Sequence, residues 1–267
     1  MHPDWLTPDW PAPPGVRALF TTRAGGTSAV PYDSMNLGDH VGDAPERVAA
    51  NRALLGQSMG ATPVFLQQVH GTAVLDIGPD TAHGQPADAA TTSQRGVACT
   101  IMVADCLPVL FSTTDGAVIA AAHAGWRGLA GMQGKGILEA TYECFKDLAL
   151  MGRAQPAINT IAWLGPCIGP AAFEVGVEVR AAFVDGDQRA EDCFKPLASD
   201  KYLADLAGLA RLRLQAMGIT QIYGNDSSTP WCTVGNASRF FSHRRDAGIA
   251  GNGFHTTGRM AACIWRE

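Results

Sequence analysis

The stretch VACTIMVADCLPVLFSTTDGAVIAAAHAGWRG, residues 97–128, contains the most continuous apolar sequence of the chain. Two apolar runs within it, Pro108–Phe111 and Ala117–Ala122, flank a turn that ends in Asp115-Gly116. Short apolar runs separated by such a turn are typical of a buried β-hairpin. A third apolar run, Val97–Val103, leads into the hairpin and predicts a further buried strand.

Polar residues stand at the ends of these apolar runs. Asp105 and Cys106 precede the first hairpin strand, and His123 ends the second. An earlier apolar run, Val64–Val69, ends in the same way, in His70. Because neighbouring strand ends meet at one edge of a sheet, we expect the thiol and the two imidazoles to converge there.

Two imidazoles and one thiolate form a known catalytic zinc set, which leaves a fourth position for water or substrate. Zinc would also lower the pKa of a bound water to about 7. Two other interpretations use the same residues. Cys106 can act as a thiolate nucleophile with His123 or His70 as its base. Alternatively, each histidine only satisfies hydrogen bonds at the end of a strand.

The rest of the chain predicts further strands and helices around this core. The expected strands are Val16–Thr21, Val64–Val69, Thr72–Ile77, Ala157–Leu164, Ile219–Tyr223, the edge Phe240–Arg245 and Met260–Trp265. The expected helices are Pro45–Met59 after a cap at Asp43, Ile137–Leu148, Glu174–Phe183, and Lys201–Met217 after a cap at Asp200.

Strands that follow one another without a helix between them argue against strict βαβ alternation. The sequence therefore predicts an α+β fold, with layered mixed β-sheets packed together and helices on the outside. We expect residues 1–267 to form a single domain, with residues 1–15 as an extended arm on its surface.

Composition restricts the class of protein. The chain has 267 residues, of which 46% are hydrophobic and 17% charged, which suffices for a large core. With a net charge of −5 and no long basic run, it is not expected to bind nucleic acid. No apolar run is long enough to predict a membrane span, and residues 1–15 are not expected to be a secretory signal, because they lack a basic start and an apolar run. Seven scattered cysteines favour the reducing cytoplasm.

Several longer motifs resemble one family. They are QQVHG at 67–71, MVADCLPVLF at 102–111, AAHAGWRGLAG at 121–131 and WLGPCIGP at 163–170. Flanking matches are FTTRAGGTS at 20–28, PYDSMNLGDHVGD at 31–43, FEVGVEVRAAF at 173–183, FFSHRRD at 240–246 and TGRMA at 257–261. These motifs, and their order along the chain, resemble those of the laccase-domain family. It is also called the polyphenol oxidase, peptidoglycan editing factor or purine nucleoside phosphorylase family.

The resemblance implies a layered α/β fold and a zinc site whose ligands match His70, Cys106 and His123. It implies phosphorolysis of adenosine, inosine and methylthioadenosine, with deamination of adenosine as a companion activity. Older family names imply copper in place of zinc and oxidation of phenols, or removal of misincorporated serine from cell-wall precursors. In that last case the protein would be an amidase whose activity depends on Cys106. A metal-binding protein without catalysis is a further alternative.

For a phosphorylase, arginines would bind the phosphate through forked hydrogen bonds. The candidates are Arg23, Arg52, Arg127 and Arg245. Asn36 is a candidate for binding ribose or base. Asp105 would orient a ligand, take a proton, or instead cap its turn. Asp88, in a loop of small residues, is a further candidate carboxylate of the site.

The histidines argue against a multicopper oxidase. Such an enzyme needs further histidines for a copper cluster beside a His2Cys site. The chain has seven histidines and no His-x-His pair.

Two segments, Met132–Gly136 and Gly248–His255, are longer than the corresponding segments of the family pattern. Their length affects the expected shape of the pocket but not the expected metal ligands. For Cys167 a buried packing role is expected.

Overall fold

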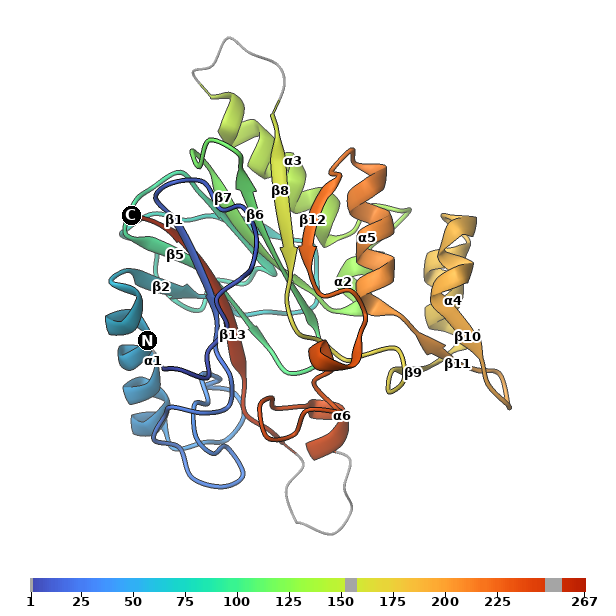
Figure 1. The fold of residues 1–267 in the computed structure, drawn as a ribbon, viewed down its shortest axis with the longest axis horizontal. Helices are drawn as coiled ribbons and strands as arrows, with labels where there is room; N and C mark the ends of the chain where they lie inside the picture. Colours follow the sequence, from blue (N-terminus) through green and yellow to red (C-terminus); the bar gives the residue numbers. More distant parts are fainter. Residues whose placement is uncertain (1, 152–157, 248–255) are drawn as a thin grey trace.

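The structure is a computed structural model and describes residues 2–151, 158–247 and 256–267. Two large β-sheets pack face to face, and helices cover the outer face of each sheet (Figure 1). This order of layers confirms the expected fold class of mixed sheets with helices outside.

The first large sheet has six strands in the order β12-β8-β6-β7-β4-β3. They are β3 (Val74–Asp76), β4 (Ala89–Thr92), β6 (Leu107–Thr113), β7 (Ile119–Ala124), β8 (Thr160–Leu164) and β12 (Gln221–Gly224). Antiparallel β6 and β7 place Leu107 opposite Ala124, which confirms the predicted hairpin. The sheet is mixed because β3 is parallel to β4 and β12 is parallel to β8.

The second large sheet has four strands in the order β1-β13-β5-β2. They are β1 (Val16–Phe20), β2 (Thr62–Phe65), β5 (Val97–Val103) and β13 (Met260–Arg266). Strand β13, from the far end of the chain, lies between β1 and β5 and is antiparallel to both. The sheet therefore joins the beginning, middle and end of the sequence.

A small three-stranded sheet stands beside the main body (Figure 1). Its strands, β9 (Glu174–Gly176), β10 (Phe194–Pro196) and β11 (Lys201–Ala204), pack with α4 (Val177–Val184) and the 3-10 helix η1 (Gln188–Cys193).

The remaining helices belong to the outer layers and to the loops. Helix α1 (Pro45–Met59) covers the four-stranded sheet. Helices α2 (Trp126–Ala130), α3 (Ile137–Leu150) and α5 (Leu206–Ala216) cover the six-stranded sheet. Short helices η2 (Thr229–Trp231) and α6 (His243–Asp246) lie in the loops before β13.

Burial on both faces explains the continuous apolar sequence of β5. Successive strand side chains point to opposite faces. Ala98 and Met102 pack toward α1, whereas Cys99 and Ile101 pack between the two sheets. Neither face meets water, so no polar alternation appears in the sequence.

The expected helix over Lys201–Met217 is wrong at its beginning. Residues Lys201–Ala204 form β11, which pairs with β9 and β10, and the helix begins only at Leu206. Its N-cap is Asp205, whose carboxylate accepts a hydrogen bond from the main-chain N of Gly208 at 2.9 Å. The expected cap, Asp200, instead adopts a positive φ of 56°.

Other predicted boundaries also need correction. Strand β2 ends at Phe65, short of the expected Val69. The expected strand edge over 240–245 contains the helix α6, capped by the side chain of Ser242. Helix α1 is capped at Ala44 without a side-chain bond, because the two carboxylate oxygens of Asp43 accept from Ala44 N and Asn36 Nδ2.

Three further predicted segments shift in part. Glu174–Gly176 is the strand β9, and its helix begins only at Val177. The expected strand Thr72–Ile77 is reduced to β3. The proposed arm is anchored where Leu6 pairs with Phe20.

Candidate metal and substrate site

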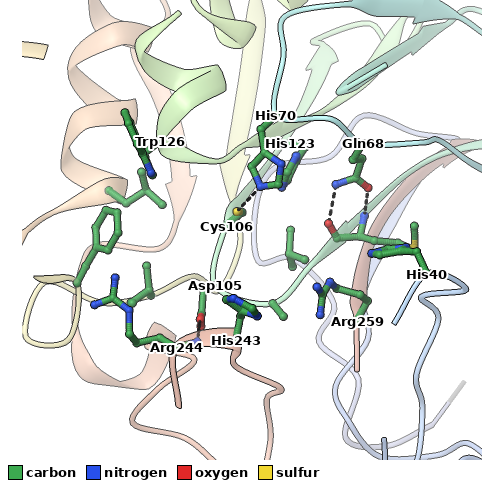
Figure 2. A pocket seen from close by; sticks show the side chains of 16 residues that line it. His40, Gln68, His70, Asp105, Cys106, His123, Trp126, His243, Arg244 and Arg259 are labelled. Atoms are coloured by element: carbon green, nitrogen blue, oxygen red, sulfur yellow. Dashed lines mark hydrogen bonds between the residues drawn. The ribbon is translucent and has the colours of Figure 1, made fainter. Parts of the chain in front are cut away.

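A cavity of about 380 Å³ opens where loops at the ends of both large sheets meet α2, α6 and the residues directly before β13. Figure 2 shows the side chains around it. The lining residues are His40, Gln68, His70, Met102, Val103, Ala104, Asp105, Cys106, His123, Trp126, Ile168, Phe173, Leu206, His243, Arg244 and Arg259. The volume falls within the usual range for small-molecule sites.

His70, Cys106 and His123 converge in this cavity. Their potential ligand atoms all lie within 4.8 Å of one another, and Nε2 of His70 is 3.7 Å from Sγ of Cys106. Cys106 directly precedes β6 and His123 lies in β7, so the antiparallel hairpin brings them together. The predicted convergence is therefore present in the fold.

His70 reaches the site by a different route from the one expected. It does not end a strand but lies five residues beyond β2, in a loop with a positive φ of 60°. Such a conformation is uncommon for a residue with a side chain. Its main-chain N donates to Oδ1 of Asp88 at 2.9 Å, which holds the loop in place.

Asp88 is fully buried and organises both histidines. Its carboxylate accepts from the main-chain N of Val69, His70 and Gly71, at 3.2, 2.9 and 2.7 Å. Oδ1 also lies 2.9 Å from Nδ1 of His123. With Nδ1 engaged in this way, His123 is left with Nε2 to face the site, as in carboxylate–histidine–metal arrangements.

Gly125 leaves the space that the ligands occupy. A Cβ at this position would lie 2.9 Å from Cδ2 of His70 and 3.0 Å from Sγ of Cys106. Gly128, one turn later, would place a Cβ 2.8 Å from the carbonyl oxygen of Gly71. The two glycines of AGWRG therefore allow α2 to pack directly against the His70 loop.

Cys106 and His123 stabilise each other's charged forms. Burial by itself raises the pKa of the Cys106 thiol, but the charge and hydrogen bond of His123, together with His70, lower it to about 6. Burial likewise opposes charge on His123, but the Cys106 thiolate and Asp88 raise its pKa to about 9. These two shifts both favour the thiolate–imidazolium form of the pair when no metal is bound.

The three side chains suit a transition-metal ion. Ligand atoms bound at ~2.0–2.3 Å around a tetrahedral ion lie roughly 3.3–3.8 Å apart. The His70–Cys106 separation of 3.7 Å agrees with this spacing. Nitrogen and sulfur donors are those that zinc and copper prefer, and three protein ligands leave a coordination position open.

Asp105 directly precedes Cys106 and lines the cavity, but its described carboxylate hydrogen bonds go to residues other than the three converging ones. One carboxylate oxygen accepts from the hydroxyl of Thr233, and the other accepts from the main-chain N of Arg244 at 2.6 Å. The backbone of Asp105 has a positive φ of 93°, which is uncommon for a residue with a side chain. Its two carboxylate hydrogen bonds help to hold this conformation beside Cys106. These contacts tie the turn at Asp105 to the loops that carry Thr233 and Arg244. The role of Asp105 toward a ligand stays a prediction.

Arg23 and Arg245 lie outside the cavity lining. Arg23 donates to main-chain oxygens of Asp33 and Ala237. Arg245 donates to main-chain oxygens and pairs with Asp246, with Nε 2.7 Å from Oδ1. Both guanidinium groups hold loops together, and neither meets the three converging residues.

Arg52 and Arg127 are also outside the lining. Arg52 stacks on the ring of Phe65 at 4.1 Å and pairs with Asp39 at 3.1 Å, in a hollow next to the cavity. Arg127 is exposed and stacks on Trp126 at 4.4 Å. Trp126 is the member of this pair that faces the cavity (Figure 2).

Asn36 is fully buried, and its amide is occupied within the protein. Nδ2 donates to Gly38 and Asp43, and Oδ1 accepts from the main-chain N of Gly38 and of Arg259, both at 2.9 Å. The structure therefore brings Asn36 to the wall behind the cavity and not to its surface.

Five polar residues of the cavity were missed as candidates in the sequence: His40, Gln68, His243, Arg244 and Arg259. All lie within motifs that carry the family resemblance. What marks them is the shape of the folded chain, because their spacing along the sequence follows no ligand pattern. The expanded segment 248–255 lies outside the described residues, whereas Met132 and Lys135 form a tight turn before α3.

Cys167 is buried, in agreement with its expected packing role. Its thiol is hydrogen-bonded to Asn225, with Nδ2 3.3 Å from Sγ.

Among the helices that the structure describes, none has the length and apolar content needed to cross a bilayer.

Comparison with known proteins gives a consistent result. A family model described as multi-copper polyphenol oxidoreductase laccase matches residues 17–267. A Pseudomonas aeruginosa protein named purine nucleoside phosphorylase is 46% identical over 264 residues, covering 98% of each chain. The purine nucleoside phosphorylase YfiH of Escherichia coli is 47% identical over 97% of this chain and 98% of its own.

A solved structure matches the fold over almost the same span. The crystal structure of a Neisseria meningitidis protein superposes with a TM-score of 0.85 at 43% identity, and covers 99% of both chains.

Proposed function

The chain belongs to the multi-copper polyphenol oxidoreductase laccase family, and on this premise we propose that it is a purine nucleoside phosphorylase. The observation that carries the proposal is the near-full-length similarity, at 46–47% identity, to proteins that bear this name. The cavity supports it, because a polar group of possible metal ligands lies beside an apolar wall.

We propose zinc as the metal and His70, Cys106 and His123 as its ligands. A zinc ion there would supply an open coordination position for phosphate, water or a ribose hydroxyl, and positive charge near the reacting atoms. Asp88 would keep the His123 ring in the tautomer that leaves Nε2 free for coordination.

The proposed substrates are small molecules: a purine nucleoside, such as adenosine, inosine or methylthioadenosine, and inorganic phosphate. A phosphate oxygen forms a bond to C1′ of the ribose while the bond from C1′ to N9 of the purine breaks. The purine leaves with the electron pair of that bond and takes up a proton, which gives free base and ribose 1-phosphate.

The cavity offers suitable walls for these substrates. Trp126 and Phe173 provide aromatic surface for a purine, and Arg244 and Arg259 provide positive charge. Asp105 and Gln68 keep the surrounding loops fixed: Gln68 exchanges two hydrogen bonds of 2.8 Å with the main chain of Met102 (Figure 2). Such rigid positioning is a main source of rate in bimolecular reactions.

Deamination of adenosine is the companion reaction that we propose for the same cavity. Water then replaces phosphate and attacks C6 of the purine, ammonia leaves, and inosine forms. Both reactions would use the same three metal ligands, so loss of the metal would abolish both.

One observation favours a second candidate function. The Cys106 thiolate beside a protonated His123 is the pairing that cysteine hydrolases use. A Cys106-dependent amidase acting on cell-wall precursors would need no metal. In contrast, no described feature favours phenol oxidation by several coppers: within residues 2–151, 158–247 and 256–267, one histidine and cysteine group could hold a metal.

A product assay separates the two candidates. Purified protein of known metal content is incubated with adenosine, inosine, methylthioadenosine and UDP-linked muropeptides, with and without phosphate, and products are identified by mass. The phosphorylase predicts ribose 1-phosphate only when phosphate is present. Complete metal removal and Cys106→Ala abolish the activity, and Cys144→Ala, at an exposed thiol, leaves it intact.

Survival of nucleoside cleavage after complete metal removal would contradict the proposed mechanism. Release of amino acid from the muropeptides by metal-free protein, with covalent labelling of Cys106, would instead support the amidase.

A further inference from the structure

Arg259 lines the part of the cavity that lies away from Trp126 (Figure 2). Its main-chain N donates to Oδ1 of Asn36 at 2.9 Å, and its carbonyl oxygen accepts from the main-chain N of Leu37 at 3.0 Å. A Cβ on Gly38 would lie only 2.7 Å from Cγ of Arg259. The Asn36–Gly38 loop thus fixes the backbone of Arg259 and leaves room for its side chain.

The guanidinium group of Arg259 lacks an acidic partner within the described part of the chain. Nη1 donates to the carbonyl oxygens of Thr257 and Gly258, at 2.9 and 3.3 Å, which fixes its orientation. Nε and Nη2 make no hydrogen bond to any described residue. Within the described part of the chain, three N–H donors of this planar group therefore have no partner and are directed to a possible ligand.

The other arginines near the cavity differ from Arg259. Arg52 pairs with Asp39, and Arg245 pairs with Asp246. Arg244 donates to two carbonyl oxygens but is exposed, so water screens its charge. Burial lowers the pKa of Arg259 despite the opposing charges of Cys106 and Asp105, neither of which forms a described hydrogen bond or ion pair with its guanidinium group. A half-buried cation without a carboxylate partner is costly unless an anion binds to it.

His40 adds a second polar group at the same end of the cavity. It lies close enough to Arg259 for the arginine charge, after burial, to lower its pKa. Gln68 closes this end, but both ends of its amide are bonded to Met102. The free donors at this end therefore belong chiefly to Arg259.

We propose that Arg259, with His40 beside it, is a binding subsite for a phosphate oxyanion. The planar fork of an arginine matches two oxygens of a phosphate group. The inference rests on the proposed function in one respect, which is the source of the anion. In a phosphorylase it is inorganic phosphate, whereas in a nucleotide-binding protein it would be the 5′-phosphate.

This subsite also sets the direction in which the nucleoside binds. A phosphate oxygen that displaces the purine approaches C1′ from the side opposite N9. Phosphate and purine must therefore lie on opposite sides of the ribose. In the view of Figure 2, Trp126 and Arg259 lie on opposite sides of Cys106 and His70. The purine accordingly lies beside Trp126, and the ribose lies next to the metal ligands.

Phosphate binding to the metal-loaded protein tests the inference directly. Isothermal titration with inorganic phosphate compares wild type, Arg259→Gln, Arg259→Lys and the control Arg189→Gln, an exposed arginine paired with Asp187. We expect about 10-fold weaker binding or more in Arg259→Gln, and a smaller loss in Arg259→Lys, which keeps the charge but not the fork. Arg189→Gln should bind as wild type.

Kinetics provide the second measurement. The KM for phosphate should rise about 10-fold or more in Arg259→Gln, while the KM for inosine changes less than about threefold. Thermal unfolding and metal content show whether each variant is folded. If Arg259→Gln does not fold, Arg259→Lys decides the matter. Wild-type phosphate affinity in a folded Arg259 variant would overturn the inference.

A second arm replaces phosphate by adenosine 5′-monophosphate. If the nucleotide, and not inorganic phosphate, depends on Arg259, the assignment to inorganic phosphate is wrong. Failure of the proposed function gives a different result: wild type would bind phosphate through Arg259 yet form no ribose 1-phosphate. Conversely, phosphorolysis with a normal phosphate KM in Arg259→Gln would uphold the function and refute the subsite.

Discussion

The carboxylate of Asp88 and the imidazole of His123 form a buried hydrogen bond of 2.9 Å between Oδ1 and Nδ1. The two residues are also joined through the backbone, where the main-chain N of His123 donates to the carbonyl oxygen of Asp88 at 2.7 Å. The same carboxylate holds the loop that carries His70. One side chain therefore controls the position of two of the three possible metal ligands.

Asp88→Asn should weaken metal binding without removing a ligand. An amide cannot accept the four hydrogen bonds that the carboxylate accepts, so the His70 loop and the His123 ring both lose restraint. Loss of such supporting contacts typically costs about 10–100-fold in metal affinity. Competition with a chromophoric chelator measures the effect. Asp76→Asn on the neighbouring strand is the control, and equal affinity in Asp88→Asn would refute the role.

Gly125→Ala should displace the ligands directly. The backbone of Gly125 has a φ of −65°, which alanine adopts without strain, so the effect comes from the added Cβ alone. This atom would press on His70 and Cys106. We expect about 10-fold weaker metal binding or more, by the same chelator assay. Gly78→Ala, which meets no atom within 4 Å, should bind metal normally. Normal binding in both variants would mean that the site adapts.

The metal-free protein should contain one unusually acidic thiol. With a pKa of about 6, Cys106 is largely thiolate at pH 7 and protonated at pH 5. Its alkylation rate should therefore reach half its maximum near pH 6, and His123→Gln should move that midpoint upward. Peptide mass spectrometry follows Cys106 and Cys144 together. Burial and nearby carboxylates raise the pKa of Cys144, so it should react only in alkaline solution. A shared midpoint would disprove the pairing.

Asp246→Asn should destabilise the fold at neutral pH more than in acid. Burial opposes ionisation of Asp246, but bonds from Arg245, Ser242 and Thr257 outweigh it and lower its pKa. A lowered pKa stabilises the folded state above the unfolded value, and this contribution disappears as pH falls through the folded value. We expect a loss of about 1–2 kcal/mol in the free energy of unfolding at pH 7.

Urea titrations of wild type and Asp246→Asn at pH 7 and at roughly pH 3 measure this difference. It should shrink in acid, because wild type then loses the same bonds. The exposed Asp9→Asn serves as control. A difference that does not change with pH would show that the charge of Asp246 is unimportant.

The core and the convergence of ligands could be predicted because both depend on local pattern. Two apolar runs and a turn predict the hairpin of β6 and β7. Antiparallel pairing of these two strands is enough to bring Cys106 and His123 together. His70 does converge with Cys106 and His123, although the strand expected before it is shorter. Its position depends on Asp88, and no local pattern shows which backbone groups a distant carboxylate will bind.

The misplaced helix start shows the same limit. Leucines at 203, 206 and 209 keep helical spacing through Asp205, but the first of them belongs to β11. Strand pairing with β9 and β10 decides this, and β9, the neighbour on one side, lies on the far side of α4 in the sequence. The arginines show it too: whether a guanidinium has a carboxylate partner depends on loop packing. Hence Arg259 could not be distinguished from Arg23 or Arg52 before the fold was known.

The central place of β13 in its sheet has a consequence for synthesis of the protein. Strands β1 and β5 emerge early during translation, but each needs β13 as a hydrogen-bonded neighbour. Until residues 260–266 emerge, both strands keep an unpaired edge, which is a hazard for aggregation. A nonsense mutation before Met260 should therefore give an insoluble polypeptide that also lacks Arg259, whereas a loss after Arg266 should be tolerated.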